Sequence, residues 1–235
     1  MNRPVAIAWF SCGTASAVAT KHTLERYGKT HEVIVIRMAI DEEHPDNDRF
    51  AIDCSDWFDH PIKTVMSRSA EDVWKRRRYM AGVNGGPCTS EIKIEERRRI
   101  VKKLQPEFQV FGYTAEEKTR LARFITSNDG PPVITPLIKA EITKQMCHVA
   151  VANAGIRLPE MYRMGFPNNN CIGCVKANGV QYWNRVKRFF PDVFEARCKL
   201  SREIGCRLLK IRGKRRFLDE IGHFDEGVNE DGPHH

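Results

Sequence analysis

The stretch VAIAWFSCGTAS at Val5–Ser16 decides the fold of this chain. Its first half, Val5–Phe10, is an apolar run that predicts a buried strand, and its second half is a turn of small residues. An amphipathic pattern follows to about Tyr27, where Gly28 is placed to end a helix. A turn between a strand and a helix directs several backbone N–H groups and the positive end of the helix dipole at one point. The stretch therefore predicts an anion-binding loop.

Strand and helix patterns alternate outward from this loop. We expect a strand over Glu32–Ile40, a helix over Asn47–Phe58 and a strand over Ile62–Met66, which indicates an α/β fold with a mostly parallel sheet flanked by helices. Further along, we expect helices over Ala70–Met80, Ser90–Leu104, Lys144–Ala154, Val180–Phe190 and Asp192–Gly205, the start of a helix over Ala115–Phe124, a strand over Phe108–Tyr113, a loop over Asn128–Pro136 and a basic strand or hairpin over Arg207–Phe217.

The bulk composition is that of an ordinary globular protein with a basic surface. A length of 235 residues fits one well-packed domain with a small appendage. We expect a nucleotide-binding α/β domain at 1–157, a helical, basic and cysteine-containing region at 158–224 and a disordered tail at 225–235. No apolar run approaches the roughly 20 residues of a membrane helix, and we expect a cytoplasmic protein. The net charge of +8 favours a polyanionic partner.

The predicted anion loop contains the residue types that phosphate binding needs. Gly13 permits close approach of the backbone to a ligand, and Ser11, Thr14 and Ser16 offer hydroxyl groups. The loop lacks the G-x-x-x-x-G-K-[ST] pattern of a Walker A motif. Cys12 lies near the start of the helix, where a thiol pKa is lowered, or it is a small packing residue. A tight strand-to-helix connection without a ligand is the alternative for the whole loop.

The segment Phe10–Ser16 resembles the SGGxDS-type PP-loop of N-type ATP pyrophosphatases and PAPS reductases. In those families Gly usually stands at the position of Cys12, and in the ATP-hydrolysing members Asp usually stands at that of Ala15. PAPS reductases commonly lack this Asp as well, so Ala15 bears on ATP cleavage and not on nucleotide binding. The resemblance implies a Rossmann-like (HUP-type) fold that binds ATP with Mg²⁺ through Ser11, Cys12, Gly13, Thr14, Ala15 and Ser16.

Three further segments carry the same resemblance, which covers roughly residues 5–195. The acidic loop DEEHPD begins with Asp41, and GYTAEE at Gly112–Glu117 resembles the family's G-x-x-x-E-E/S…R segment. Pro136–Ile138 together with Leu158–Gly165 resembles its P-L…L-Y-x-x-G stretch. The resemblance implies nucleotide contacts for Gly112 and Tyr113, a position near the nucleotide or its metal for Asp41 and for Glu116 or Glu117, and charge neutralisation by Arg120 and Arg123.

Three of the eight cysteines form a candidate metal site. Cys171 and Cys174 are a CxxC pair, whose spacing suits one zinc ion, an iron–sulfur cluster or a redox pair, and Cys88 is the natural third member. The alternatives are a zinc site completed by a further His or Cys, a reducible disulfide, or buried thiols without a role. Cys54, Cys147, Cys198 and Cys206 are expected to be packing residues.

The segment around Cys88, GGPCTSEIK, resembles a region of assimilatory APS reductases in which a Cys-Cys pair and a downstream Lys join a later CxxC around a [4Fe-4S] cluster. Here Pro87 stands at the first cysteine of that pair. The resemblance therefore implies a cluster held by three thiolates, with one iron open to bind hydrosulfide as in the cluster-dependent tRNA thiolases. Such a site suits sulfur insertion better than electron transfer.

Three basic runs, at 75–78, at 97–103 and at 207–216, predict a groove for nucleic acid, and phosphosulfate or pyrophosphate binding is the alternative. The whole pattern resembles the PP-loop component of DNA phosphorothioation systems, with tRNA thiolation second. It implies an ATP-dependent sulfur-transfer enzyme that adenylates nucleic acid, receives sulfur from a cysteine desulfurase and forms a homo-oligomer. An APS/PAPS-type reductase is the first alternative, although the C-terminal E-C-G-L-H segment of the thioredoxin-dependent enzymes is missing. A non-catalytic binding module is the second.

Overall fold

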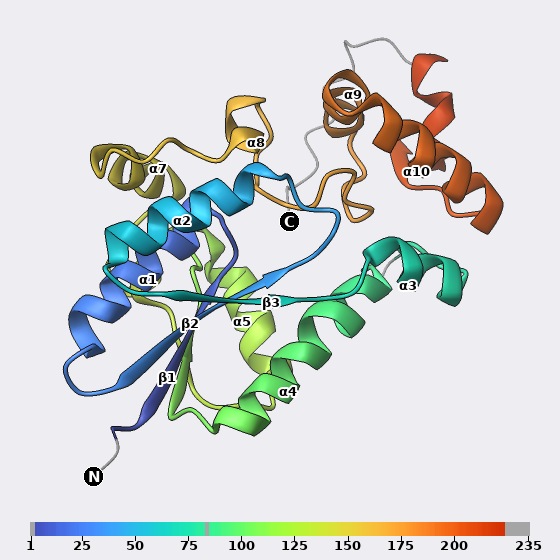
Figure 1. Cartoon of the computed structure of the whole chain (residues 1–235). Helices are drawn as coiled ribbons and strands as arrows, with labels where there is room; N and C mark the ends of the chain where they lie inside the picture. Colours follow the sequence, from blue (N-terminus) through green and yellow to red (C-terminus); the bar gives the residue numbers. More distant parts are fainter. Residues whose placement is uncertain (1–2, 83–84, 224–235) are drawn as a thin grey trace. The chain divides into compact units, whose positions relative to one another are not determined.

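Five parallel strands form the central sheet of the computed structural model, which describes residues 3–82 and 85–223 (Figure 1). The sheet order is β3-β2-β1-β4-β5. The strands are β1 (Val5–Phe10), β2 (Glu32–Ala39), β3 (Ile62–Met66), β4 (Phe108–Val110) and β5 (Val133–Ile134), and every pair is parallel. The prediction of a Rossmann-like, mostly parallel α/β sheet is confirmed. The strand order reverses between β1 and β4, and such switch points are where open α/β sheets bind ligands, at the carboxyl ends of the strands.

Helices cover both faces of this sheet. Ala6, Ala8 and Phe10 point to one face, where they pack with residues of α1 (Thr14–Tyr27), α2 (Asp46–Phe58) and α7 (Lys144–Asn153). Ile7 and Trp9 point to the other face, against residues of α4 (Glu95–Leu104). This alternation follows from the two-residue period of a strand, and a strand buried on both faces reads as an unbroken apolar run. The helices α1 and α7 lie side by side (Figure 1).

The described residues divide into two compact units. The first contains 3–39, 45–66 and 96–163, and therefore the sheet, and the second contains 40–44, 67–82, 85–95 and 164–223. Two internal segments, 40–44 and the described part of 67–95, group with the C-terminal region. The predicted domain boundary between 157 and 158 stays a prediction. The predicted tail at 225–235 lies outside the described residues.

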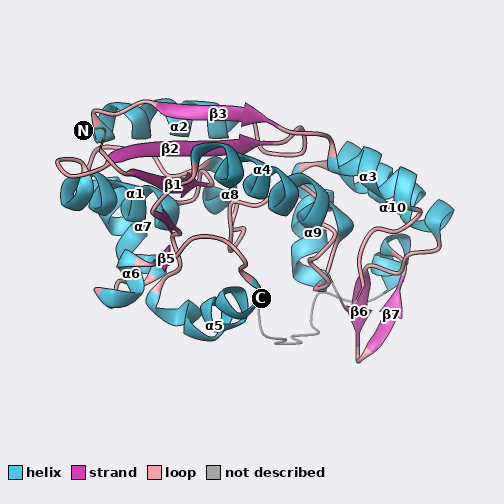
Figure 2. Ribbon diagram, turned by 90° about the horizontal axis from the view of Figure 1, so that it is seen from below, coloured by secondary structure: helices cyan, strands magenta, loops and turns pink. Residues whose placement is uncertain are grey.

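The second unit is mainly helical. It contains α3 (Ala70–Arg77), a π-helical turn η1 (Thr89–Ile94), α9 (Val180–Phe189), α10 (Pro191–Ile204) and a 3₁₀ turn η3 (Leu218–His223). Figure 2 shows β6 (Leu209–Ile211) and β7 (Lys214–Arg216) as a separate antiparallel hairpin, which confirms the hairpin predicted over Arg207–Phe217. The remaining elements of the chain are α5 (Lys118–Ser127), α6 (Pro136–Lys139), α8 (Glu160–Arg163) and a 3₁₀ turn η2 (Ala115–Glu117).

The structure corrects several predicted boundaries. The predicted loop Asn128–Pro136 contains β5, which pairs with β4 over two residues, too few to produce a periodic pattern. The helix predicted over Ala70–Met80 ends at Arg77, because Arg78 takes a left-handed conformation with φ of 50°. The strand predicted over Phe108–Tyr113 ends at Val110. Short pairing and a single left-handed residue are decided by neighbours in space, and no local pattern shows them.

Candidate functional site

The loop Ser11–Ser16 follows β1 and leads into α1 at the carboxyl edge of the sheet. The Ser16 hydroxyl donates to the Gly13 carbonyl oxygen at 2.8 Å and accepts from the Ser11 amide at 3.1 Å. The Ser11 hydroxyl also donates to Ser16 Oγ at 3.2 Å. These bonds close the turn. Gly13 precedes the helix and has no side chain to cap it, so the first amide groups of α1 are left to an incoming anion.

Gly112 packs directly against this loop. A Cβ atom at Gly112 would lie 2.7 Å from the backbone nitrogen and Cα of Ser16, closer than any side chain permits. Gly112 follows β4, so the two strands on either side of the switch point deliver the loop and the GYTAEE segment to one place. The sequence predicted both segments as nucleotide contacts, and the structure brings them together within the first unit.

The carboxylates of the GYTAEE segment make contacts within the protein. Glu117 accepts hydrogen bonds from the amide and hydroxyl of Thr114 at 3.1 and 3.2 Å and pairs with Arg120. Glu116 accepts from the amide of Lys144 at 3.1 Å. Glu116 has a lowered pKa, because hydrogen bonds from its own backbone, Thr114 and Lys144 outweigh burial, which raises it. These bonds fix the segment beside the loop, while direct contact of either carboxylate with a nucleotide or metal stays a prediction.

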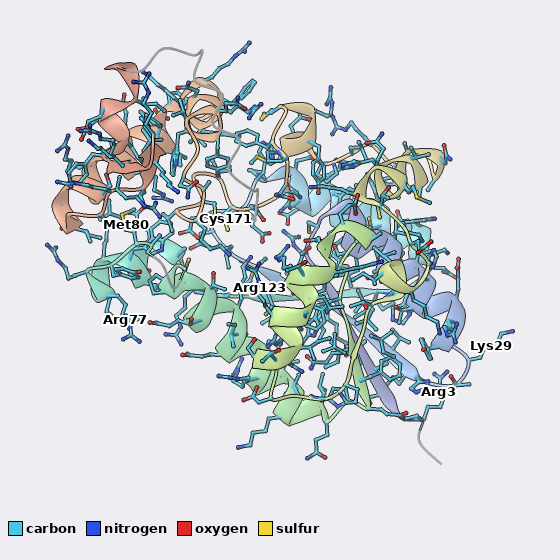
Figure 3. The ribbon with its side chains drawn as sticks, turned by 180° about the vertical axis from the view of Figure 1, so that it is seen from behind. Arg3, Lys29, Arg77, Met80, Arg123 and Cys171 are labelled. Carbon is cyan, nitrogen blue, oxygen red and sulfur yellow. The ribbon has the colours of Figure 1, made fainter. Side chains whose placement is uncertain are left out.

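The other predicted charged residues are less closely tied to the loop. The Arg120 guanidinium lies 5.4 Å from the ring of Tyr113, whose pKa is raised mainly by burial. Arg123 is exposed on α5 (Figure 3). Asp41 belongs to the second unit, in the segment Ile40–His44. The roles of Arg123 and Asp41 therefore stay predictions.

Three residues that the sequence did not single out surround the start of α1. Thr14 Oγ1 lies 3.3 Å from His148 Nδ1, and the rings of His148 and Tyr162 meet edge to face at 4.6 Å. Lys144 Nζ lies 5.6 Å from the centre of the Tyr162 ring, and Tyr162 Oη lies 3.3 Å from the position of a Cβ at Gly13. The signals in the sequence were the L-Y-x-x-G resemblance, which includes Tyr162, and the spacing of Lys144 and His148, four residues apart and so on one helix face.

Burial and the neighbouring Lys144 lower the pKa of His148, so its imidazole is neutral at pH 7. Burial also lowers the pKa of Lys144, against the carboxylates of Glu117 and Glu116, which raise it. A neutral imidazole can accept from the Thr14 hydroxyl or donate to it, depending on its tautomer. The start of α1 therefore has a hydrogen-bonding side chain and a nearby ammonium beside its free amide groups.

Cys12 is completely buried and its thiol donates to the carbonyl oxygen of Asn47 at 3.6 Å. Its φ is 55°, in the left-handed region that glycine enters most easily. Both observations favour the packing role over reactivity. Cys54 and Cys147 are fully buried as well, and burial raises the pKa of both thiols, that of Cys147 to about 12. They are packing residues, as predicted.

Cys88, Cys171 and Cys174 lie together in the second unit. Cys88 directly precedes η1, and the CxxC pair lies in the loop before α9, where Figure 3 labels Cys171. Burial raises the pKa of Cys171 to about 12, Lys93 lowers it, and Cys174 and Cys88 raise it. Burial also raises the pKa of Cys88, which Cys174 raises further. The thiols of Cys88 and Cys171 therefore lie close enough to Cys174 for its charge to raise their pKa.

Lys93, on η1, faces the same three thiols. Burial lowers its pKa, but the negative charges of Cys171, Glu43, Cys174 and Cys88 outweigh burial, and the net shift is upward. A retained ammonium beside three thiols favours their thiolate forms, which are the forms that bind metal. A π-helical turn often marks a functional site, and here it carries this lysine.

The loop that holds the CxxC pair is fixed by its surroundings. Tyr182 Oη accepts from the amide of Cys174 at 2.8 Å and donates to the carbonyl oxygen of Cys171 at 3.3 Å. Gly173 has φ of 64°, and a Cβ there would lie 2.9 Å from Val193 Cγ1. Both features favour glycine at this position, which shapes the turn between the two thiols.

A buried indole N–H group lies beside the thiols and bears on whether they suit an iron–sulfur cluster. Trp74 is 2% exposed, and its Nε1 has no hydrogen-bond partner of ordinary geometry within residues 3–82 and 85–223. It nevertheless interacts with Cys88, whose pKa it lowers. Buried N–H donors beside thiolates are a usual feature of cluster sites, where they tune the sulfur ligands. The three thiols, with the Trp74 N–H group beside Cys88, therefore fit an iron–sulfur cluster.

The zinc alternative fits less well. In the part of the chain that the structure describes, no group of three His, Cys, Asp or Glu side chains is arranged to hold a single metal ion. A structural zinc ion needs four ligands that converge on one point. The thiolates of a cubane bind different iron atoms, so they need not converge on one point.

Ion pairs occupy much of the predicted basic surface. In the second unit, Glu91 binds both Arg76 and Arg77, and Arg78 pairs with Glu203 at 3.0 Å. In the first unit, Arg98 pairs with Asp129 and Arg99 with Glu96. Arg202 and Arg216 of the second unit pair with Asp219 and Glu220. Internal carboxylates thus offset several of the charges that suggested a nucleic-acid groove.

The comparisons with known proteins give structural neighbours only. No family model matches the sequence, and no curated protein matches it. The chain is similar to the U34-tRNA thiolase NcsA from Methanococcus maripaludis, solved with its [4Fe-4S] cluster, at a TM-score of 0.49 and 14% identity over 99% of this chain and 77% of that one. It is also similar to the phosphoadenylyl-sulfate (PAPS) reductase from Candida auris in a phosphate complex, at a TM-score of 0.45 and 14% identity over 68% of this chain and 77% of that one.

A membrane-spanning helix would have to be long and apolar, and none of the helices formed by residues 3–82 and 85–223 meets that requirement. The predictions of a cytoplasmic location and of a homo-oligomer stay predictions.

Proposed function

We propose that this chain is an ATP-dependent sulfur-transfer enzyme that adenylates a nucleic-acid substrate. The observation that supports this best is the closed Ser11–Ser16 loop at the switch point of the sheet, with Gly112 packed against it. An anion at that point meets the amide groups at the start of α1 and the hydroxyl of Ser11, which is exposed, whereas Thr14 is completely buried. ATP supplies such an anion in its phosphates.

Residues of the first unit bind ATP in this proposal. The loop cradles the phosphates, Gly112 allows the GYTAEE segment to approach, and Lys144 offers positive charge. Mg²⁺ that arrives with ATP is held by one or two carboxylates and by the phosphates themselves, so it needs no dedicated cage. Glu116 and Glu117, in the segment beside the loop, are the candidates for this role, and Asp41 is a third candidate by sequence resemblance alone.

The reaction proceeds in two displacements. An oxygen of the nucleic acid attacks the α-phosphorus of ATP, a new P–O bond forms and pyrophosphate leaves. A sulfur nucleophile then attacks the activated centre of the nucleic acid, and AMP leaves with the original oxygen. The phosphate charge that develops in the first step is stabilised by the amide groups at the start of α1 and by Arg120 or Arg123.

The thiol group of the second unit is the proposed place of the sulfur chemistry. Cys88, Cys171 and Cys174 would hold a [4Fe-4S] cluster, with Lys93 and the Trp74 indole next to the thiolates. Bound there, a cluster with three protein ligands supplies one iron that is free to carry sulfide. A cysteine desulfurase is the proposed source of that sulfur.

DNA phosphorothioation is the acceptor reaction that the sequence resemblance favours, and tRNA thiolation is the second. The test is a pyrophosphate-release assay with the purified protein, ATP and either double-stranded DNA or tRNA, with a cysteine desulfurase and cysteine present. We expect pyrophosphate and AMP only when one of the nucleic acids is present. Sulfite release from PAPS without ATP cleavage would instead establish a reductase, and nucleotide binding without either product would establish a binding module.

A further inference from the structure

A groove of about 530 Å³ on α9 is lined by basic residues that the predicted basic runs did not include. It lies wholly within the second unit. Its lining consists of Met164, Asn184, Arg185, Lys187, Arg188 and Phe189. The buried side of α9 is formed by Trp183 and Val186, which anchor the helix and leave the basic residues outward.

Within the described parts of the chain, the three cations of this groove are not offset by neighbouring carboxylates. Among the residues that the structure describes, no carboxylate lies within ion-pairing distance of Arg185, Lys187 or Arg188, and none lines the groove. The runs at 75–78 and 97–99 are largely paired with Glu and Asp side chains, as described above. Unpaired cations around a hollow give a positive potential that favours a polyanion.

An aromatic ring lies beside these charges. Phe189 is 36% exposed, one of the few large apolar side chains on the surface, and the Arg188 guanidinium lies 5.2 Å from the centre of its ring. The buried ring of Phe166 supports it at 6.4 Å. An exposed, supported ring next to arginines is the arrangement on which unpaired bases stack. A duplex keeps its bases inside and cannot use such a ring.

We propose that this groove binds a single-stranded stretch of nucleic acid, with phosphates at Arg185, Lys187 and Arg188 and one base stacked on Phe189. Arg185 and Phe189 are four residues apart, so the charge and the ring share one helix face. Asn184, on the same helix, lines the groove with them. The inference deepens the proposed function, on which it rests for its choice of nucleic acid over another polyanion.

The test is fluorescence anisotropy with a labelled single-stranded oligonucleotide, competed by the matching duplex and by heparin. The variants are Lys187→Ala/Arg188→Ala, whose side chains are exposed, and Phe189→Ala, with Phe189→Trp as the variant that keeps a stacking ring. The matched control is Lys29→Ala/Lys199→Ala, which removes the same charge from exposed positions outside the groove, one in each unit. Melting temperatures establish that each variant is folded.

We expect Lys187→Ala/Arg188→Ala to weaken single-strand binding about tenfold or more and to lower the salt dependence by roughly one to two released counterions. Phe189→Ala weakens single-strand binding about tenfold and leaves heparin binding unchanged, and Phe189→Trp restores it. Equal losses in the Lys29/Lys199 control would overturn the site, because they would show general attraction to charge. The site would also be overturned if the duplex competed as well as the single strand. The same holds if Phe189→Ala weakened heparin binding as much as single-strand binding.

Failure of this inference is separable from failure of the proposed function. ATP binding to the wild-type protein, measured without any oligonucleotide, tests the nucleotide loop alone. A protein that binds ATP and releases pyrophosphate with nucleic acid, yet is indifferent to changes on α9, would retain the proposed function and lose this groove as its nucleic-acid site.

Discussion

Thr14 and His148 meet at the start of α1, where the threonine hydroxyl lies 3.3 Å from Nδ1 of the imidazole. Thr14 is the first residue of the helix behind the nucleotide loop, and His148 lies on α7, which packs along α1. The contact therefore connects the loop to a helix more than a hundred residues away in the sequence. Its strength depends on pH, because only the neutral ring can accept from the hydroxyl.

Replacing His148 with Gln should reduce the loss of unfolding free energy that occurs as the pH is lowered. The folded protein holds the pKa of His148 below its unfolded value, so the unfolded chain binds more protons as the pH falls below about 6.5. His148 thus contributes stability above that pH which is lost as the pH falls toward the folded pKa. Urea denaturation between pH 7.5 and 5.5 should show a smaller decrease for His148→Gln. Thr14→Val keeps the imidazole and should keep the decrease, and equal profiles for His148→Gln and wild type would refute the assignment.

Ser16→Ala should weaken ATP binding. The Ser16 hydroxyl closes the loop through Gly13 and Ser11, and its loss removes bonds worth roughly 1 kcal/mol each, or about three- to thirtyfold in affinity. Calorimetric titration with ATP measures the change. Thr30→Ala removes an exposed hydroxyl near the opposite end of α1 and should leave the affinity unchanged. An unaltered affinity in Ser16→Ala would show that the loop does not hold the phosphates.

Gly112→Ala should destabilise the first unit and disturb the loop. The added methyl group would lie 2.7 Å from backbone atoms of Ser16, which cannot turn aside as a side chain can. Overpacking of this kind costs about 1–3 kcal/mol of unfolding free energy. Gly222→Ala, where no atom lies within 4 Å, is the control and should change stability by less than about 0.5 kcal/mol. Equal stability of the two variants would contradict the packing of Gly112 on the loop.

Asp46→Asn should destabilise the protein at pH 7 and much less in acid. Asp46 receives a two-pronged bond from Arg49 at 2.7 Å and the amide of Glu160 at 2.9 Å. Burial raises the pKa of Asp46, but these bonds and Arg157 outweigh it, and the net shift is downward. A carboxylate with a lowered pKa stabilises above the unfolded value of about 3.9 and loses that effect as the pH falls through the folded value. Chemical denaturation at pH 7 should show that Asp46→Asn lowers the free energy of unfolding by about 1–3 kcal/mol relative to wild type. If this difference between the two proteins did not shrink below pH 4, the stabilising role of the Asp46 carboxylate would be contradicted.

Loss of any one of the three grouped thiols should abolish cluster binding. Anaerobically purified wild-type protein should contain iron and acid-labile sulfide and absorb broadly in the visible region, and Cys171→Ala should lack all three signals. Cys198 offers a matched control in the same unit, since it is half-buried and its pKa is raised to about 11, mainly by burial. Cys198→Ala should keep the cluster. A wild-type protein that contains zinc and no iron would refute the cluster assignment.

Local patterns were sufficient for the elements that position the nucleotide loop. The bounds predicted for β1 and β3 are those of the structure, and the helix after the loop ends at Tyr27 as expected. The apolar run of β1 and a closing glycine are strong local signals. The short strand β5, the π-helical turn at η1 and the early end of α3 at Arg78 were missed. The strand β5 depends on its pairing with β4, and α3 ends where Arg78 takes a left-handed conformation.

The sequence by itself determined the α/β class, the position of the anion loop after β1 and the choice of three cysteines out of eight. Only the tertiary structure showed that Gly112 lies against Ser16, that His148 and Lys144 stand beside the loop, and that Lys93 and Trp74 face the thiols. It also decided which basic residues are offset by carboxylates and which, on α9, remain unpaired among the described residues. The reason is physical: periodicity and turn chemistry act over a few residues, whereas pKa shifts, ion pairs and close backbone contacts depend on distances that only the folded chain sets.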